Sequence, residues 1–345
     1  MGDDRARMLL RIIERAAFFP AMARLPAALG YRMACWRGDW LFRSQAGTRT
    51  EVARNLRLVL GDELSQVAAQ RVTRDWFRFG SCELVDVNRL RHGARPLRRL
   101  VEIRGREHLE AALAAGKGAI LCTGHFGSND SGFSLLHASG FPVTSIGRVW
   151  YRYDADLSSA ERRFWDLHFK QARRLRQRPN IEPWPGRPQV AALAATALRA
   201  NEVVTIAIDA RPLDSDRARV VEVPFLGRRA GLLPGAVALA QITGAPLLMG
   251  FMYRAADYHH QVLEISAPVP AEGETTTAFG RCAAEVSAAI RRSPAHWEFW
   301  GKTDDLVGLG LIPPQPDSSP AAVPDLLPAG RVQRDGSADN VSARG

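Results

Sequence analysis

Residues 117–132 read KGAILCTGHFGSNDSG, and this stretch decides how the chain folds. Its apolar part, Ala119 to Thr123, carries no charge and follows a glycine, a pattern typical of a buried strand in a parallel sheet. Polar and titratable side chains begin abruptly after it, with His125 and Asp130 five positions apart. In open α/β sheets, ligands bind where such strands end. The stretch therefore predicts an α/β fold with a functional site directly after this strand.

The H-x4-D spacing of this stretch is weak evidence by itself. With 8 histidines and 36 acidic residues among 345, chance gives about 0.8 matches to H-x4-[D/E], and His259 with Glu264 is a second match. In a strand or a regular helix, side chains five positions apart point in different directions. They can meet only at a strand–turn–helix junction, which Gly124 and Gly127 permit at His125. No glycine accompanies the second match, so we expect chemistry at His125.

A histidine paired with a carboxylate indicates general-base chemistry. A neutral imidazole takes a proton from an alcohol near neutral pH, and a carboxylate on its other ring nitrogen fixes the tautomer. No serine nucleophile is needed if the substrate supplies the hydroxyl. The alternative is a buried histidine whose hydrogen bonds are satisfied by an aspartate that caps a helix, and the spacing alone does not exclude it.

Four stretches together resemble one family. GAILCTGHFGSND is similar to the first motif of the glycerolipid and lipid A acyltransferases, and VTSIGRVW to their second block, an arginine after a strand. TIAIDARPLDSDRARVVEVPFLGRRAGLLPGAVALAQITGAPLL resembles the third block, and TRTEVARNLRLVLGDELS the helical lead-in. The likeness runs from about Arg49 to Trp300 and is greatest with the bacterial lipid A lauroyl/myristoyl acyltransferases and phosphatidylinositol mannoside acyltransferases.

The resemblance implies a fold and an activity. The expected fold is a single α/β domain of the glycerolipid-acyltransferase type, with a mainly parallel central sheet flanked by helices and preceded by N-terminal amphipathic helices. The expected enzyme is an O-acyltransferase that moves a fatty acyl group from acyl-CoA or acyl carrier protein to a hydroxyl of a membrane glycolipid or phospholipid. It implies neither a cofactor nor a metal ion.

The resemblance also assigns roles to individual residues. His125 is the expected general base and Asp130 its orienting partner. Lipid A members usually carry Glu where this chain has Asp130, while mannoside-type and glycerol-phosphate-type enzymes carry Asp, so the residue leaves the acceptor lipid open. The expected substrate-binding residues are Gly127 through nearby backbone amides, Arg148 through phosphate, and, with less support, Asp209, Arg211 and Gly227.

Charge and cysteine content restrict the environment. The net charge of +10 and the pI of about 10.1 favour anionic partners: a membrane surface, an acyl carrier or nucleic acid. No recognised nucleic-acid-binding module is present, so no nucleic acid is expected as partner. Cys35, Cys82, Cys122 and Cys282 form no C-x-x-C pair, which argues against a zinc site or a disulfide framework and fits a reducing cytoplasm. A second hypothesis remains: a catalytically inactive, basic adaptor that binds membranes or nucleic acid.

The first 45 residues predict association with a membrane. Residues 8–19 show the apolar spacing of an amphipathic helix, which Pro20 should end or kink. Residues 25–43 combine aromatic residues with arginines, as expected at the headgroup level of a bilayer, although such a helix could also pack on the protein itself. No run is long and apolar enough to be read as a transmembrane helix. The sequence thus predicts a peripheral protein on the cytoplasmic face of the bacterial plasma (inner) membrane.

Three regions follow from these patterns. Residues 1–45 are the membrane-associating helices, 46–310 the catalytic domain and 311–345 a proline-rich tail expected to be disordered. Within the domain, strands and helices alternate, as in α/β sheets. The expected strands are 101–104, 119–123, 143–146, 203–208, 220–223, 246–251 and 262–265. The expected helices are two within 49–91 and one each at 108–115, 189–200, 235–243 and 276–292.

Overall fold

A computed structural model describes residues 10, 13–147, 159, 162–163, 165–167, 170, 180–183, 189–212 and 214–314. The predicted tail after position 314 and the predicted site residue Arg148 lie outside this range. Contacts between Cα atoms group the chain up to Pro313 into one compact unit. The description below concerns that unit.

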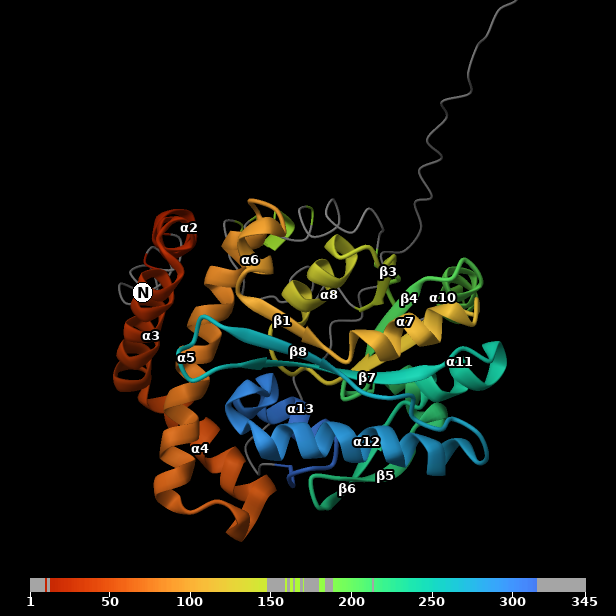
Figure 1. The fold of residues 1–345 in the computed structure, drawn as a ribbon. Helices are drawn as coiled ribbons and strands as arrows, with labels where there is room; N and C mark the ends of the chain where they lie inside the picture. Colours follow the sequence, from red (N-terminus) through yellow and green to blue (C-terminus); the bar gives the residue numbers. More distant parts are fainter. Residues whose placement is uncertain are drawn as a thin grey trace, which may run out of the picture. The chain divides into compact units, whose positions relative to one another are not determined.

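A six-stranded sheet forms the centre, in the order β1-β8-β7-β2-β4-β3 (Figure 1). The strands are β1 (Val101–Arg104), β2 (Ala119–Thr123), β3 (Val143–Ile146), β4 (Val203–Ala207), β7 (Leu247–Arg254) and β8 (Gln261–Ile265). Every neighbouring pair is parallel except β7 with β8, which form a hairpin. The prediction of a mainly parallel sheet is therefore confirmed.

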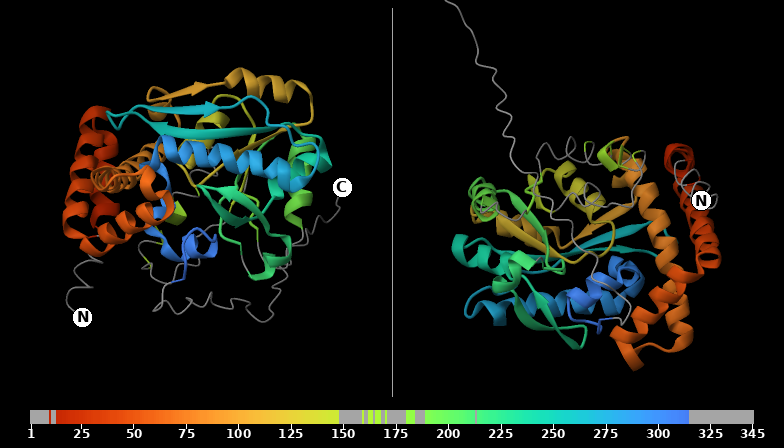
Figure 2. Two further views of the ribbon diagram at one scale, coloured as in Figure 1. Left: turned by 90° about the horizontal axis from the view of Figure 1, so that it is seen from below. Right: turned by 180° about the vertical axis from the view of Figure 1, so that it is seen from behind.

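The central strand β2 is buried on both faces, as its uncharged sequence requires. Its side chains alternate between two cores: Ile120 and Cys122 belong to one hydrophobic cluster, Ala119 and Leu121 to the other. The first cluster packs beneath α11 (Gly235–Thr243) and α12 (Thr275–Arg292), and the second beneath α7 (Arg106–Ala114) and α8 (Asn129–Ala138). Figure 2 (left) shows α12 running along β7 and β8. The sheet is thus covered by helices on both faces.

Most predicted elements are found close to their predicted limits, with two exceptions. A second hairpin, β5 (Val221–Phe225) and β6 (Arg228–Leu232), contains a strand that the sequence did not predict. Helical structure also continues through Pro20: a π-helical segment (Glu14–Phe18) leads into α2 (Phe19–Arg24), where the proline occupies the first turn and its missing N–H is not needed. Of the two outcomes predicted at Pro20, an end or a kink, the end is wrong, because α2 continues to Arg24.

A group of helices stands at one end of the sheet, beside the β7–β8 turn (Figures 1 and 2). These are α3 (Ala27–Ser44), α4 (Ala46–Leu60) and α5 (Gln66–Leu90), and α3 packs along α5. The inward face of α3 includes the buried residues Tyr31 and Ala34. Leu29, Trp36 and Trp40 are exposed on its other face. One face of this segment therefore packs on the protein, and the other is left to solvent. None of the helices in the described ranges is both long and apolar enough to span a bilayer.

The remaining helices complete the unit. They are α6 (Arg95–Arg98), α10 (Gln189–Arg199), α13 (Thr303–Gly308) and short 3-10 turns at Gly61–Glu63, Asp214–Arg219, Pro294–His296 and Glu298–Gly301. Trp297 and Trp300 are fully buried, and the core continues past them to Leu311 and Ile312. The hydrophobic core thus extends two residues beyond the predicted boundary at 310.

Candidate active site

The sheet places Asp209 beside His125. Strands β2 and β4 are parallel neighbours, and Thr123 pairs with Ala207 at their last residues. Two residues further along each chain come His125 and Asp209, so the same register brings them to one edge of the sheet. This is the carboxyl edge, where parallel α/β sheets bind ligands.

Asp209 holds the imidazole of His125 by its Nδ1 atom. Nδ1 lies 2.7 Å from Oδ1 of Asp209, and the backbone N–H of His125 donates to both carboxylate oxygens at 2.9 Å. Nε1 of Trp297 donates to Oδ2 of the same carboxylate at 2.8 Å. Asp209 is fully buried, whereas the side chain of His125 keeps 34% of its surface exposed. With Nδ1 bonded to the carboxylate, Nε2 is the nitrogen that remains for a substrate.

Electrostatics favour an ionised Asp209 next to a basic His125. Burial opposes the charge of each group, yet their mutual attraction outweighs it. The pKa of His125 is raised above its ordinary value because the carboxylates of Asp209 and, more weakly, Glu298 stabilise its protonated form. The pKa of Asp209 is lowered because His125 and Trp297 stabilise its anion. The pair can therefore accept a proton at Nε2 and hold the resulting imidazolium.

Two glycines shape the loop around His125. A Cβ on Gly124 would lie 2.9 Å from Oδ2 of Asp209, so only glycine lets the carboxylate come this close. Gly127 has φ +71°, and a Cβ there would meet the carbonyl oxygen of Met252 at 2.1 Å. The N–H of Gly127 donates to the carbonyl of His296 at 3.0 Å and is not available to a substrate. The N–H of Gly127 is therefore not a donor for an oxyanion in this conformation.

Asp130, the predicted partner of His125, lies in the first turn of α8 and is half-buried. The structure gives the Nδ1 position to Asp209, which the sequence had placed among the weaker substrate-binding candidates. The start of α8 is anchored to α5, because Oγ of Ser128 donates to Oδ2 of the buried Asp86 at 2.8 Å. Asp130 thus lies near the loop that carries His125, but the hydrogen bond to Nδ1 of the His125 ring comes from Asp209.

Asp86 connects this loop to the N-terminal helices. It accepts hydrogen bonds from the hydroxyl of Tyr31 on α3, from Arg254 on β7 and, at 3.2 Å, from Nε2 of Gln261. The side chains of Asp86 and Arg254 are each only 1% exposed, so they form a buried ion pair. The network joins α3, α5, β7, β8 and the loop before α8. Sequence patterns did not indicate it, since its hydrogen-bonded partners are up to 175 residues apart.

The other predicted site residues lie elsewhere. Arg211 forms an ion pair with Asp305 of α13, with Nε 3.7 Å from Oδ1. Gly227 lies in the turn of the β5–β6 hairpin with φ +79°, directly after Leu226, which also has a positive φ. The positive φ required by this turn is by itself a sufficient reason for a glycine at position 227. Binding roles for Arg211 and Gly227 stay predictions.

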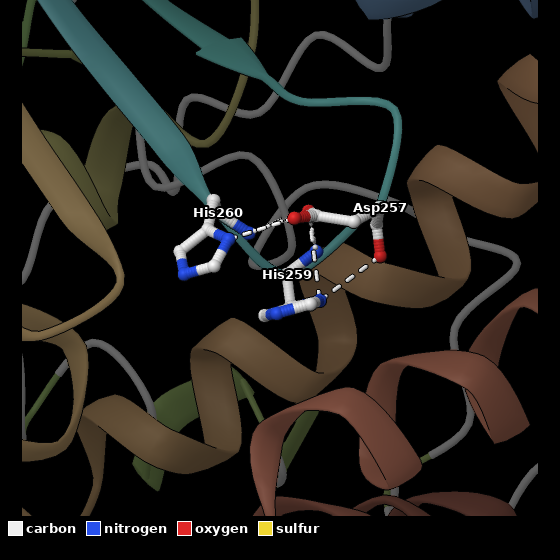
Figure 3. A group of neighbouring side chains, drawn as sticks. All are labelled: Asp257, His259 and His260. Carbon is white, nitrogen blue, oxygen red and sulfur yellow. Dashed lines mark hydrogen bonds and ion pairs between the residues drawn. The ribbon is translucent and has the colours of Figure 1, made fainter.

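The second H-x4-[D/E] match is explained by other contacts. Glu264 bonds Arg292 at 2.6 and 3.0 Å. His259 belongs to a group with Asp257 and His260 in the β7–β8 turn (Figure 3). Asp257 accepts the backbone N–H groups of both histidines at 3.0 Å, so it caps the turn. One ligand atom of each residue lies within 4.8 Å of the others, the only such cluster suited to a metal ion in the described part of the chain.

Comparison with known proteins identifies the family. A search of curated proteins gives no match. The family model described as bacterial lipid A biosynthesis acyltransferase matches residues 8–302, which is most of the chain and includes His125, Asp209 and Trp297. With its α/β sheet and its histidine–carboxylate pair at the carboxyl edge, the chain therefore belongs to the bacterial lipid A biosynthesis acyltransferase family.

Proposed function

We propose that this acyltransferase moves a fatty acyl group from acyl-CoA or acyl carrier protein to a hydroxyl of a membrane glycolipid or phospholipid. The observation that carries the proposal is the His125–Asp209 pair. Its carboxylate is buried and fully hydrogen-bonded, and its imidazole is accessible at the edge of the sheet. Family membership supplies the reaction class, and the pair supplies the base that the reaction requires.

The proposed chemistry needs no nucleophile from the protein. Nε2 of His125 removes the proton of the acceptor hydroxyl as its oxygen attacks the thioester carbonyl. Asp209 stabilises the imidazolium that forms. The tetrahedral intermediate then collapses: the carbon–sulfur bond breaks, the imidazolium returns its proton to the thiolate, and the ester product and a free thiol leave. The proton and the electron pairs balance without any further reagent.

Two further elements of the proposal concern charge. Backbone N–H groups at the start of α8 would bind the oxyanion, because the N-terminus of a helix favours negative charge. Arg148 and Arg211 would bind the phosphates of the donor, since guanidinium groups pair well with phosphate. Asp130, half-buried in the first turn of α8, is proposed as a second carboxylate that helps to hold the histidine or the acceptor.

The exposed face of α3 supports a position on the membrane. Trp36 and Trp40 are 58% and 46% exposed, and Leu29 is 45% exposed on the same helix. Arg32 and Arg43 are exposed beside them. Aromatic and cationic side chains together suit the headgroup level of an anionic bilayer. We therefore propose that α3 docks the enzyme on the cytoplasmic face of the bacterial plasma membrane, where a lipid acceptor is reached.

The test measures thioester turnover by the purified full chain. Wild type is incubated with medium- and long-chain acyl-CoA and with the matching acyl carrier protein thioesters, and the released thiol is followed. Wild type is expected to turn over one of these donors and His125→Ala to lose the activity, while Glu264→Gln retains it. If wild type released no thiol from any donor, the inactive adaptor would be the better reading. If wild type does turn over a donor, mass spectrometry of lipids from cells lacking the gene identifies the acceptor by its missing acyl chain.

A further inference from the structure

One face of α5 packs against the loop that carries His125 and against the segment around His296. The ring of Phe79 packs on His296, with their centroids 4.7 Å apart. Two turns further along the helix, Asp86 accepts a hydrogen bond from Ser128 at 2.8 Å. Glu83 lies four positions after Phe79 and three before Asp86, so it shares their face of the helix. Glu83 therefore lies on this face of α5, between the two contacts.

The segment opposite Glu83 is the one that holds the base. The N–H of Glu298 donates to the carbonyl of His125 at 3.0 Å, and the N–H of Gly127 to the carbonyl of His296. Phe126 and Trp297 form an isolated antiparallel β-bridge between the loop that carries His125 and the segment 296–298. The catalytic loop is thus tied to residues 296–298, and α5 crosses beside both.

No hydrogen bond or ion pair among the described residues explains a glutamate at position 83. It is half-buried, and among the described residues its carboxyl group has neither a hydrogen-bond partner nor an ion-pair partner. The charged groups that act on it are Glu298, Asp86, Asp130 and Arg254. Three of these are acids, and Arg254 is already engaged by Asp86. Burial and the neighbouring acid Glu298 raise the pKa of Glu83 well above its ordinary value, which favours its protonated form.

We propose that Glu83 is a substrate-binding residue that donates a hydrogen bond to an uncharged oxygen of the acceptor, next to the hydroxyl that is acylated. This inference rests on the proposed acyl transfer. A neutral carboxyl group that is half-buried and unpartnered retains the capacity to donate to a ligand. The acids around His125 would repel a phosphate group at this point but accept hydroxyl groups. The acceptor is therefore one in which the acylated hydroxyl belongs to a polyhydroxylated, uncharged part, such as a sugar ring, rather than lying beside its phosphate.

The test separates acceptor binding from donor binding. Radiolabelled acyl-CoA is used with an under-acylated lipid A and with a phosphatidylinositol mannoside as acceptor probes. Glu83→Ala is expected to raise the KM for the acceptor about ten-fold, the loss typical of one hydrogen bond between neutral groups, while the KM for the donor changes less than about two-fold. Glu83→Gln keeps a neutral donor of the same shape and is expected to stay within about two-fold of wild type. The exposed loop residue Glu272 provides the control, Glu272→Ala, which is expected to behave as wild type.

Each outcome decides the matter. A Glu83→Ala variant with an unchanged acceptor KM would overturn the inference and leave the acyltransferase proposal standing. So would equal losses for donor and acceptor, or a Glu83→Gln variant as impaired as Glu83→Ala, because these indicate a structural role or a required negative charge. The melting temperature of each variant identifies a folding defect. A wild type that turns over no thioester would remove the proposed function and this inference together.

Discussion

Asp209 and His125 are 84 residues apart in the chain, yet the parallel register of β2 and β4 makes them neighbours at the sheet edge. The carboxylate bonds both the ring and the backbone N–H of His125, so the position of the base depends on one fully buried acid. This arrangement predicts a larger role for Asp209 than its sequence context indicated.

Asp209→Asn is expected to lower kcat by about 10²–10⁴ without unfolding the protein, since an amide in place of the carboxylate neither fixes the tautomer reliably nor stabilises the imidazolium. His125→Ala is expected to lose at least as much. The measurement is kcat at saturating thioester, with Glu264→Gln as the control whose carboxylate bonds Arg292 instead. Asp130→Asn is the informative comparison: a loss as large as that of Asp209→Asn would give both acids a part in the chemistry. A fully active Asp209→Asn would refute the proposed dyad.

The pH profile should report the same pair. The base must be neutral to accept a proton, so the rate is expected to rise with pH through the pKa of His125. Asp209 raises that pKa above its ordinary value of 6.5, which places the inflection on the alkaline side of 6.5. Asp209→Asn removes the attraction and leaves the effect of burial, which lowers the pKa of His125. The residual activity of that variant should therefore have its inflection at lower pH than wild type, and an inflection that does not move would contradict the assignment.

The sequence indicated the fold well because its signals are local. The uncharged run before His125 is typical of a buried strand, and the predicted limits of β1, β2 and β3 agree with those observed. The partner of His125 could not be found this way, because the bond to Asp209 depends on the order of the strands and not on spacing along the chain. One signal was available: Asp209 also ends a buried strand, and two parallel strands present their carboxyl ends at one edge.

Strand β6 shows a second limit of local signals. Its sequence, Arg228–Leu232, has no β-branched residue and begins with two arginines. Only its alternation reveals it, with Ala230 and Leu232 buried against the core. The pairing with β5 depends on the turn, where Leu226 and Gly227 both take positive φ, and a leucine gives no hint of that conformation.

The buried network around Asp86 should be important for stability. Asp86→Ala would leave the guanidinium of Arg254 buried and without its carboxylate, a change that typically costs about 3–5 kcal/mol. Ser128→Ala removes one hydrogen bond from the same carboxylate, so about 1 kcal/mol is expected. Urea unfolding measures both values. A loss for Asp86→Ala no larger than that for Ser128→Ala would show that the ion pair contributes little.

Replacing both exposed tryptophans of α3 should weaken membrane binding. In liposome flotation with anionic vesicles, Trp36→Ala/Trp40→Ala is expected to bind less than wild type with an unchanged melting temperature, because both side chains are exposed. Binding of wild type should weaken with salt, since charges are screened over about 10 Å at 0.1 M. Ile242→Ala is the matched control: this apolar side chain is 78% exposed on α11. Equal loss in the control, or none in the double variant, would argue against docking through α3.

Shortening the chain from its C-terminal end should define where the folded unit stops. Leu311 and Ile312 are 0% and 4% exposed, and the N–H of Leu311 donates to the carbonyl of Leu306 at 2.9 Å. A chain ending at Pro314 keeps these contacts and is expected to retain the melting temperature and the acyl-transfer rate of the full chain. A chain ending at Gly310 loses both side chains, and each contributes about 1.5–3 kcal/mol by burial. A chain ending before Trp297 loses the indole that bonds Asp209 as well, and is expected not to fold. If the Pro314 chain folded normally but lost acyl transfer, the last residues would have to act in the reaction or in docking a substrate.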